Sequence, residues 1–223
     1  MTFRPLLIGA LALGLAACGG ETATESAVST DGTTTAVAAT PVPAGTYDID
    51  GSHSAASFGI RHLGISTVRG NFDGVTGTVT VGETLSTLEA TARIDASTIS
   101  TGNPDRDGHL QSPDFFDVAQ YPEITFTSTE VRPGEGDSFT LVGDLTMHGV
   151  TKPVELEGTF LGAATMGDTQ KIGFSARGEI DRKQWGLTWA ETNEVGEALV
   201  GDEVTLEIEV QANRQAAEAP AEA

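Results

Sequence analysis

The chain has 223 residues, which is enough for one domain of ordinary size with additional segments at its ends. It carries 32 acidic and 12 basic residues, a formal net charge of −20. Nucleic acids and anionic lipid surfaces are bound through basic patches, so this charge argues against both classes of partner.

The amino terminus has the pattern of a bacterial secretion signal, which we assign to Met1–Ala17. A positive charge at Arg4 precedes the apolar run Leu6–Leu15, which is shorter than the about 20 apolar residues that span a bilayer. The tetrapeptide LAAC, ending at Cys18, resembles the lipobox, in which the signal is cut before a cysteine that becomes lipidated. The alternative is a plain signal peptide with an unrelated cysteine. A lone cysteine also excludes an internal disulfide.

The residue after the cysteine is glycine rather than aspartate, which resembles lipoproteins sorted to the outer membrane. We therefore expect a lipid anchor at Cys18 on the periplasmic side of that membrane. Residues 18–44 follow the signal, and their part Gly20–Ala44 lacks aromatic residues and periodicity, which predicts a flexible tether. A folded domain at 45–213 and a disordered acidic tail, Arg214–Ala223, complete the predicted organisation.

The first half of the domain shows alternating apolar residues, the signature of strands with one buried face. Turn signals such as Asp73-Gly74 separate the runs. The predicted strands are Thr46–Asp50, Ser54–His62, Val68–Phe72, Val75–Val81 and Ser86–Asp95. The pattern then changes at Asn103, a good N-cap, which is followed by Pro104 at the first helical position. A short helix is predicted over Pro104–Gln111.

The central stretch Tyr121–Phe160 predicts three further strands, Glu123–Val131, Ser138–Met147 and Lys152–Phe160. The dipeptide His148-Gly149 is a candidate two-residue hairpin turn, with glycine supplying a positive φ. This turn places three pairs of residues opposite one another, and each pair falls on one face. The pairs are Met147 with Val150, Gly143 with Val154, and Leu141 with Leu156.

The last part of the domain predicts a polar loop, Leu161–Thr169, a strand, Lys171–Ile180, and an irregular segment, Asp181–Asp202. The irregular segment holds Trp185 and Trp189, which we interpret as packing at a barrel end. A final strand carries apolar residues from Val204 to Val210 on one face and glutamates on the other. The glutamates are interpreted as a solvated face or as protection of a sheet edge. Such an edge would also permit a homodimer.

These elements predict an all-β fold, an antiparallel barrel of about eight strands with a short helical insertion. A barrel of this size encloses either a packed core or a small ligand. Small residues on the inward faces favour an apolar cavity, although glycine in strands also marks bends. The inward small residues are Ala56, Gly70, Gly77, Ala90, Ala92, Gly143, Gly158, Ala176 and Gly178.

Several long motifs in order resemble the YceI family of bacterial lipid-binding proteins. They are YDIDGSHSAASFGIRHLGI, RDGHLQSPDFFDVAQYP, GDLTMHGVTKPV and FSARGEIDRKQWGL, and the resemblance covers roughly Thr46–Val210. The resemblance implies an extended lipocalin-like barrel in the periplasm, with a long isoprenoid or other lipid chain in its apolar interior. His148 departs from the family, whose members commonly carry asparagine there, and we expect the hairpin to remain intact.

The candidate cavity lining follows from the inward apolar positions, with an ordinary packed core as the alternative. It comprises Phe58, Ile60, Phe72, Phe126, Leu141, Leu145, Leu156, Phe174 and Leu206. The helical insertion is a natural lid, and its side chains Arg106, His109, Phe115 and Phe116 are candidates for contact with a head group. The alternative is an Asp107–Arg106–His109 network that holds the lid to the barrel.

We therefore expect a carrier of an isoprenoid lipid, of the polyprenyl or quinone type, with no cofactor, no metal and no catalytic residue assigned. The histidines lack metal-ligand spacing, and no nucleophile or phosphate-loop motif is present. The first alternative is a membrane-anchored interaction or stress-response module without a ligand. A lipid-ester hydrolase is a third reading, which would need a Ser–His–acid triad assembled in space.

Overall fold

The computed structural model describes residues 40–196 and 198–216. The predicted signal peptide, Cys18, residues 19–39 of the predicted tether and residues 217–223 of the predicted tail lie outside this part. Within it, no helix has the length and apolar character needed to cross a membrane.

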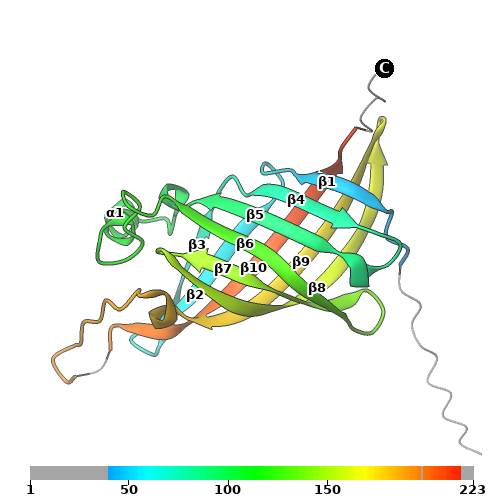
Figure 1. Cartoon of the computed structure of the whole chain (residues 1–223). Coiled ribbons are helices and arrows are strands. Elements are labelled where there is room, and N and C mark those ends of the chain that lie inside the picture. Colours follow the sequence, from blue (N-terminus) through cyan, green and yellow to red (C-terminus); the bar gives the residue numbers. More distant parts are fainter. Residues whose placement is uncertain (1–39, 197, 217–223) are drawn as a thin grey trace, which may run out of the picture. The chain divides into compact units, whose positions relative to one another are not determined.

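The described domain is a single antiparallel sheet of ten strands that closes on itself (Figure 1). Its one α-helix, α1 (Pro104–Gln111), matches the predicted bounds, and Asn103 caps it by accepting the backbone N–H groups of Asp105 and Arg106. Three short 3₁₀ turns accompany it: η1 (Leu85–Thr87), η2 (Ala96–Thr98) and η3 (Arg182–Trp185). The strands are β1 (Gly45–Ile49), β2 (Ala55–His62), β3 (Ser66–Phe72), β4 (Thr76–Val81), β5 (Glu89–Asp95), β6 (Glu123–Pro133), β7 (Ser138–Met147), β8 (Val150–Met166), β9 (Thr169–Asp181) and β10 (Val200–Arg214).

The ten strands occupy eight positions around the barrel. One edge of β10 pairs with β9, and the other is shared between β2, along Val200–Glu209, and β1, along Ala212–Arg214. In the same way, β3 pairs with β2 while β4 pairs with β1 and β5. Strands β1 and β2 therefore occupy one position of the barrel end to end, with a break between them, as do β3 and β4. This confirms the predicted all-β class, an antiparallel barrel of about eight strands with a short helical insertion.

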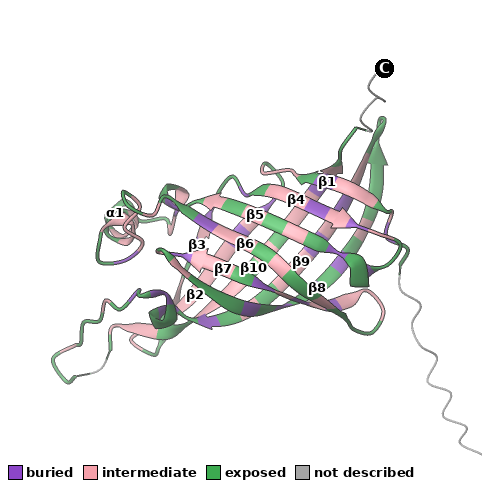
Figure 2. Ribbon diagram, viewed as in Figure 1, coloured by how far each residue is buried: buried purple, intermediate pink, exposed green. Residues whose placement is uncertain are grey.

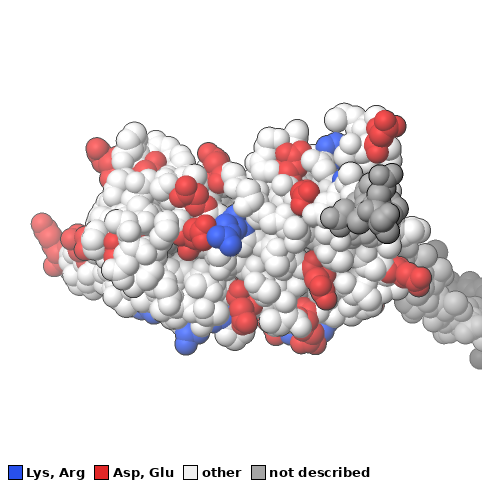
Figure 3. Space-filling model, turned by 45° about the horizontal axis from the view of Figure 1, so that its top comes forward, with Lys and Arg blue, Asp and Glu red and all other residues white. Residues whose placement is uncertain are grey.

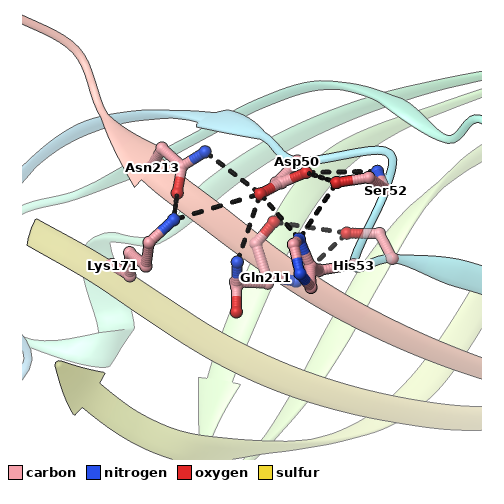
Figure 4. A network of polar contacts seen from close by, with 7 residues as sticks. Asp50, Ser52, His53, Lys171, Gln211 and Asn213 are labelled. Atoms are coloured by element: carbon pink, nitrogen blue, oxygen red, sulfur yellow. Dashed lines mark hydrogen bonds and ion pairs between the residues drawn. The ribbon is translucent and has the colours of Figure 1, made fainter. Parts of the chain in front are cut away.

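The interruption between β1 and β2 is held by Asp50 on the outside of the barrel (Figure 4). Its carboxylate accepts hydrogen bonds from the Ser52 hydroxyl at 2.6 Å, from the Gln211 amide at 3.2 Å and from the Asn213 amide at 3.3 Å. Lys171 Nζ lies 4.0 Å away. The hydrogen bond from the Ser52 hydroxyl, with smaller contributions from His53, Asn213 and the backbone N–H of Ser52, outweighs the effect of burial and holds the pKa of the Asp50 carboxyl well below its ordinary value. The break in the strand is therefore a fixed bend.

The central hairpin has the predicted register. Met147 pairs with Val150, Gly143 with Val154, and Leu141 with Leu156. Both turn residues are left-handed, with φ of +50° at His148 and +72° at Gly149, as a two-residue hairpin with the twist of its strands requires. His148 is the less favoured residue there. Its ring lies edge-on to Tyr121 and its Nδ1 is 3.1 Å from the carbonyl oxygen of Trp185, contacts that offset the strain.

Two predicted segments differ from the structure. The predicted loop Leu161–Thr169 is mostly strand, because β8 continues past a bulge at residues 160–162 to Met166 and turns only at Gly167. The last five residues of the predicted tether, 40–44, pack on the barrel instead of remaining free: Val42 is buried in the core and Thr40 bonds to Asp137.

The last strand also differs from its prediction. Arg214, assigned to the tail, is the final residue of β10 and pairs with Tyr47. The interpretation of β10 as a sheet edge is wrong, because hydrogen-bonded neighbours lie on both of its sides. Its glutamates form a solvated face, so this strand offers no edge for a homodimer. The exposed residues that alternate with buried ones along the strands are seen in Figure 2.

Candidate functional site

The inward-facing glycines do not leave empty space, contrary to the expectation from their size. An aromatic ring lies across several of them. A Cβ added at Gly143 would lie 2.3 Å from Cζ of Phe126, and one added at Gly158 would lie 2.3 Å from Cε2 of Phe139. The glycines therefore let phenylalanine rings lie flat against the sheet, a contact that any larger residue would prevent.

The alanines, in contrast, face an inner cavity of about 140 Å³. Its walls contain no charged side chain, and the polar residues among them are Thr91, Thr125 and Ser175. The lining includes the alanines Ala56, Ala90, Ala92 and Ala176, together with six of the nine predicted residues, Phe126, Leu141, Leu145, Leu156, Phe174 and Leu206. An apolar space of this size stays dry unless hydrocarbon fills it.

A second and larger space, the outer chamber, lies at the end of the barrel that carries α1. Its volume is about 500 Å³. The other three predicted lining residues, Phe58, Ile60 and Phe72, form part of its wall. Leu206 lines both spaces, so the inner cavity and the outer chamber follow one another along the barrel. The predicted head-group residues Arg106, His109, Phe115 and Phe116 all line the outer chamber.

Two separate sets of hydrogen bonds hold the lid that carries α1. The Arg106 guanidinium donates to the Thr101 hydroxyl at 2.7 Å and to the Thr101 carbonyl oxygen at 2.9 Å. Asp107 accepts from the backbone N–H of Thr101 at 2.8 Å. His109 Nε2 lies 3.0 Å from a carboxylate oxygen of Asp114. The lid is thus anchored through Thr101, and His109 belongs to a different set, so the single Asp107–Arg106–His109 network does not form.

A second segment, between η3 and β10, completes the mouth. Trp189 packs against two rings of the lid, with its ring centroid 5.4 Å from that of His109 and 5.2 Å from that of Phe115. Trp185 is only 2% exposed and donates its indole N–H to the carbonyl oxygen of Leu145 at 3.0 Å. Trp185 therefore packs the barrel end, as predicted, whereas Trp189 joins the two segments across the outer chamber.

Arg182 is the functional candidate that the sequence did not suggest. It is 3% exposed, lines the outer chamber, and donates to the carbonyl oxygens of Gly201 at 2.8 Å and Leu187 at 2.5 Å. Asp202 lies 3.4 Å from its Nη2. Burial lowers the pKa of the Arg182 guanidinium, and the nearby carboxylates oppose that shift. Its position in an irregular segment gave no periodic signal that could have revealed it.

The bend between β1 and β2 brings a serine, a histidine and an aspartate together, but their geometry is not that of a catalytic triad. The Ser52 hydroxyl and the Asp50 carboxylate both lie 3.0 Å from the same atom, Nδ1 of His53. A triad needs the serine and the acid on opposite ring nitrogens. None of the three residues lines the inner cavity or the outer chamber, and His53 is exposed. Among the described residues, no group of three or more His, Cys, Asp or Glu is placed to hold a metal ion.

Comparisons with known proteins agree with this architecture. The sequence model of the YceI-like domain matches residues 47–212. Protein YceI of Salmonella arizonae is 39% identical over 146 residues, covering 63% of this chain and 74% of the relative. The Campylobacter jejuni YCEI protein superposes with a TM-score of 0.61 at 32% identity, covering 70% of this chain and 90% of that one. A polyisoprenoid binding domain from Saccharophagus degradans superposes with a TM-score of 0.56 at 18% identity, covering 76% of this chain and 98% of that one, and shares the fold.

Proposed function

Because the chain belongs to the YceI family, we propose that its barrel binds an isoprenoid lipid, with the tail in the inner cavity and the head group in the outer chamber. The observation that carries this proposal is the succession of two spaces that share Leu206, the inner one without charge and the outer one with polar groups. The name of the S. degradans neighbour, which describes a polyisoprenoid binding domain, points to the same class of ligand.

The inner cavity would contribute affinity by burying the tail, and the outer chamber would contribute specificity for the head group. Burial of hydrocarbon contributes about 0.8 kcal/mol for each CH₂, so a five-carbon isoprene unit gains up to roughly 4 kcal/mol before ordering costs are subtracted. The inner cavity offers that gain to an unbranched or methyl-branched tail, because its walls are aliphatic and aromatic. Hydrogen bonds at the mouth then select the head group, in the way that a few polar groups set specificity in other apolar pockets.

The test is to extract the purified protein with organic solvent, identify bound lipids by mass spectrometry, and titrate the delipidated protein with geranylgeraniol and with a quinone. We expect an isoprenoid in the extract or saturable uptake of at least one probe. The competing proposal of a ligand-free interaction module requires a blank extract and no uptake of either probe, and that pair of results would remove the carrier function. The proposal assigns no catalytic step to the barrel.

We further propose that the protein is a lipoprotein on the periplasmic side of the outer membrane. The support is the LAAC motif ending at Cys18, with glycine as the next residue. A cysteine carrying several acyl chains anchors stably, whereas a single chain binds membranes only weakly. Metabolic labelling with an alkyne fatty acid should mark the wild-type protein and leave Cys18→Ser unlabelled in the soluble fraction. A wild-type protein without label would contradict the anchor and leave the ligand proposal untouched.

A further inference from the structure

A layer of buried side chains closes the end of the barrel opposite α1, the end at which β1 begins in Figure 1. On four neighbouring strands, the inward residue one step beyond the wall of the inner cavity belongs to the same core cluster as that wall but does not line the cavity. These residues are Val81 of β4, Tyr47 of β1, Ala212 of β10 and Ile172 of β9, and each is at most 2% exposed. On this side of the barrel, the inner cavity therefore stops at that layer.

A strap formed by residues 40–44, with the sequence TPVPA, crosses the same end of the barrel. Near β1, the Tyr47 hydroxyl and Nη2 of Arg214 donate to two carbonyl oxygens of the strap at 2.8 and 2.7 Å. At its other end, the backbone N–H and the hydroxyl of Thr40 donate to the carboxylate of Asp137 at 2.6 and 2.8 Å. Asp137 lies in the turn between β6 and β7, which are three and four positions away from β1 in the sheet. The strap thus joins opposite sides of the barrel.

Val42, in the middle of the strap, covers the side of the barrel end where β7 contributes no closing residue. Phe139 lines the inner cavity and is only the second residue of β7, so this strand has no inward side chain beyond it. Val42 is 8% exposed and belongs to the same core cluster as Phe139 and Phe174, which both line the cavity. The strap is therefore part of the end wall of the cavity.

The sequence of the strap suits a fixed wall, and family membership does not account for it. Pro41 and Pro43 flank Val42. Proline fixes φ and has no backbone N–H, so the segment is stiff and its prolines donate to no strand ladder. The strap also lies outside residues 47–212, which the model of the YceI-like domain covers.

We propose that the strap sets the longest isoprenoid tail that the barrel accepts. This inference rests on the proposed function and adds a specificity-determining element to it. A tail that enters through the outer chamber and fills the inner cavity meets the end wall. Each further isoprene unit then stays on the side of the outer chamber, where it displaces the head group from its place. Release of the strap opens the wall beside Phe139, and longer tails then extend through it.

The experiment loads the delipidated wild-type protein with an equimolar mixture of polyprenols of three to eleven isoprene units, supplied in detergent micelles. The retained alcohols are extracted and quantified by mass spectrometry against the mixture supplied. We expect retention to rise with chain length while the tail fills the cavity, because each added unit buries more apolar surface. Beyond the limit set by the end wall, retention should fall at least ten-fold within two further units.

Two variants release the strap by different routes. Val42→Gly removes the side chain that completes the wall, and Asp137→Ala removes the carboxylate that holds Thr40. In both variants we expect the share of chains longer than the wild-type limit to rise about ten-fold, while the shorter chains keep their proportions to one another. Circular dichroism confirms that each variant is folded, and Asp137→Ala alone decides the question if Val42→Gly does not fold.

The matched control is Asp168→Ala, which removes an exposed carboxylate from the turn between β8 and β9. Acidic side chains are spread over the face of the barrel seen in Figure 3, and the chain as a whole carries −20. The loss of one carboxylate is therefore a small change in total charge. The control should keep the wild-type limit, so that a shift in Asp137→Ala reports the lost bonds to Thr40.

The outcomes separate this inference from the function on which it rests. A wild-type profile that rises without a limit up to eleven units would overturn the role of the strap and leave lipid binding intact. A limit that stays the same in every folded strap variant would also overturn it and leave the strap with a structural role alone. Retention of no polyprenol by the wild-type protein would remove both the inference and the proposed function.

Discussion

Filling the inner cavity from Ala92 tests where the lipid tail lies. Ala92 belongs to β5, between Gly77 of β4 and Phe126 of β6, and it lines the inner cavity but not the outer chamber. The substitution Ala92→Leu adds three carbon atoms on that wall. An empty space of 140 Å³ costs about 3 kcal/mol at roughly 24 cal/mol per Å³, so the protein without ligand has stability to gain.

The magnitudes follow from the number of added carbons. Three buried carbons contribute about 2 kcal/mol at ~0.8 kcal/mol each, and strain from imperfect packing reduces this to about 1 kcal/mol. In a domain of this size we expect the Tm without ligand to rise by about 2–4 °C. The leucine occupies space that the tail would otherwise fill, so binding loses about 2 kcal/mol, which is roughly a thirty-fold weaker affinity.

Thermal unfolding followed by circular dichroism measures the first effect, and calorimetric titration with geranylgeraniol measures the second. The control is Ala164→Leu, which adds the same atoms to an exposed position of β8 and should change neither quantity beyond a few tenths of a kcal/mol. A raised Tm together with wild-type affinity would refute the placement of the tail in the inner cavity. A lowered Tm would refute the claim that the space beside Ala92 is open.

Three further predictions concern stability. A hydrogen bond from Ser52 lowers the pKa of Asp50 from 3.8, so the ionised carboxylate stabilises the fold above pH 3.8. Asp50→Asn should therefore lower the Tm at pH 7, and the difference in Tm from the wild type should shrink as the pH falls below 3.8. A hydrogen bond with Glu179 raises the pKa of Glu203 from 4.5. The stability that the protonated Glu203 contributes is therefore present below pH 4.5 and is lost as the pH rises past the raised pKa. Glu203→Gln should raise the Tm at pH 7 and leave it unchanged near pH 3. Gly143→Ala places a Cβ 2.3 Å from a ring carbon and should cost about 1–3 kcal/mol in urea unfolding, whereas Gly108→Ala in α1, where nothing lies within 4 Å, should not destabilise.

Each of these three has an outcome that would contradict it. If the difference in Tm between Asp50→Asn and the wild type did not change with pH, the destabilisation would come from the shape of the amide and not from the lost charge of the carboxylate. A Tm of Glu203→Gln equal to that of the wild type at pH 7 would mean that the two carboxylates do not repel one another. Equal stability of the two glycine variants would show that the ring over Gly143 moves aside without cost.

Much of this barrel was predictable from local chemistry. Period-2 alternation places apolar residues on one face of a strand wherever the strand pairs, and a two-residue turn with left-handed backbone sets the register of β7 against β8. For this reason the pairing of Leu141 with Leu156 was predicted correctly. The bounds of α1 were predictable for the same kind of reason, because a cap is satisfied by the residue itself and its neighbours two and three positions along the chain.

The features that local chemistry left undecided all depend on contacts between distant residues. Whether an inward small residue leaves a hollow depends on the neighbouring strand: Phe126 covers Gly143, whereas the wall beside Ala92 stays open. Trp189 and Arg182 come from an irregular segment, and they reach the outer chamber only because the barrel closes and brings that segment against the lid. The surroundings of Arg182 are also a tertiary property, since they depend on which carboxylates and carbonyl oxygens the fold brings within a few ångströms of it and not on the number of acidic residues in the chain.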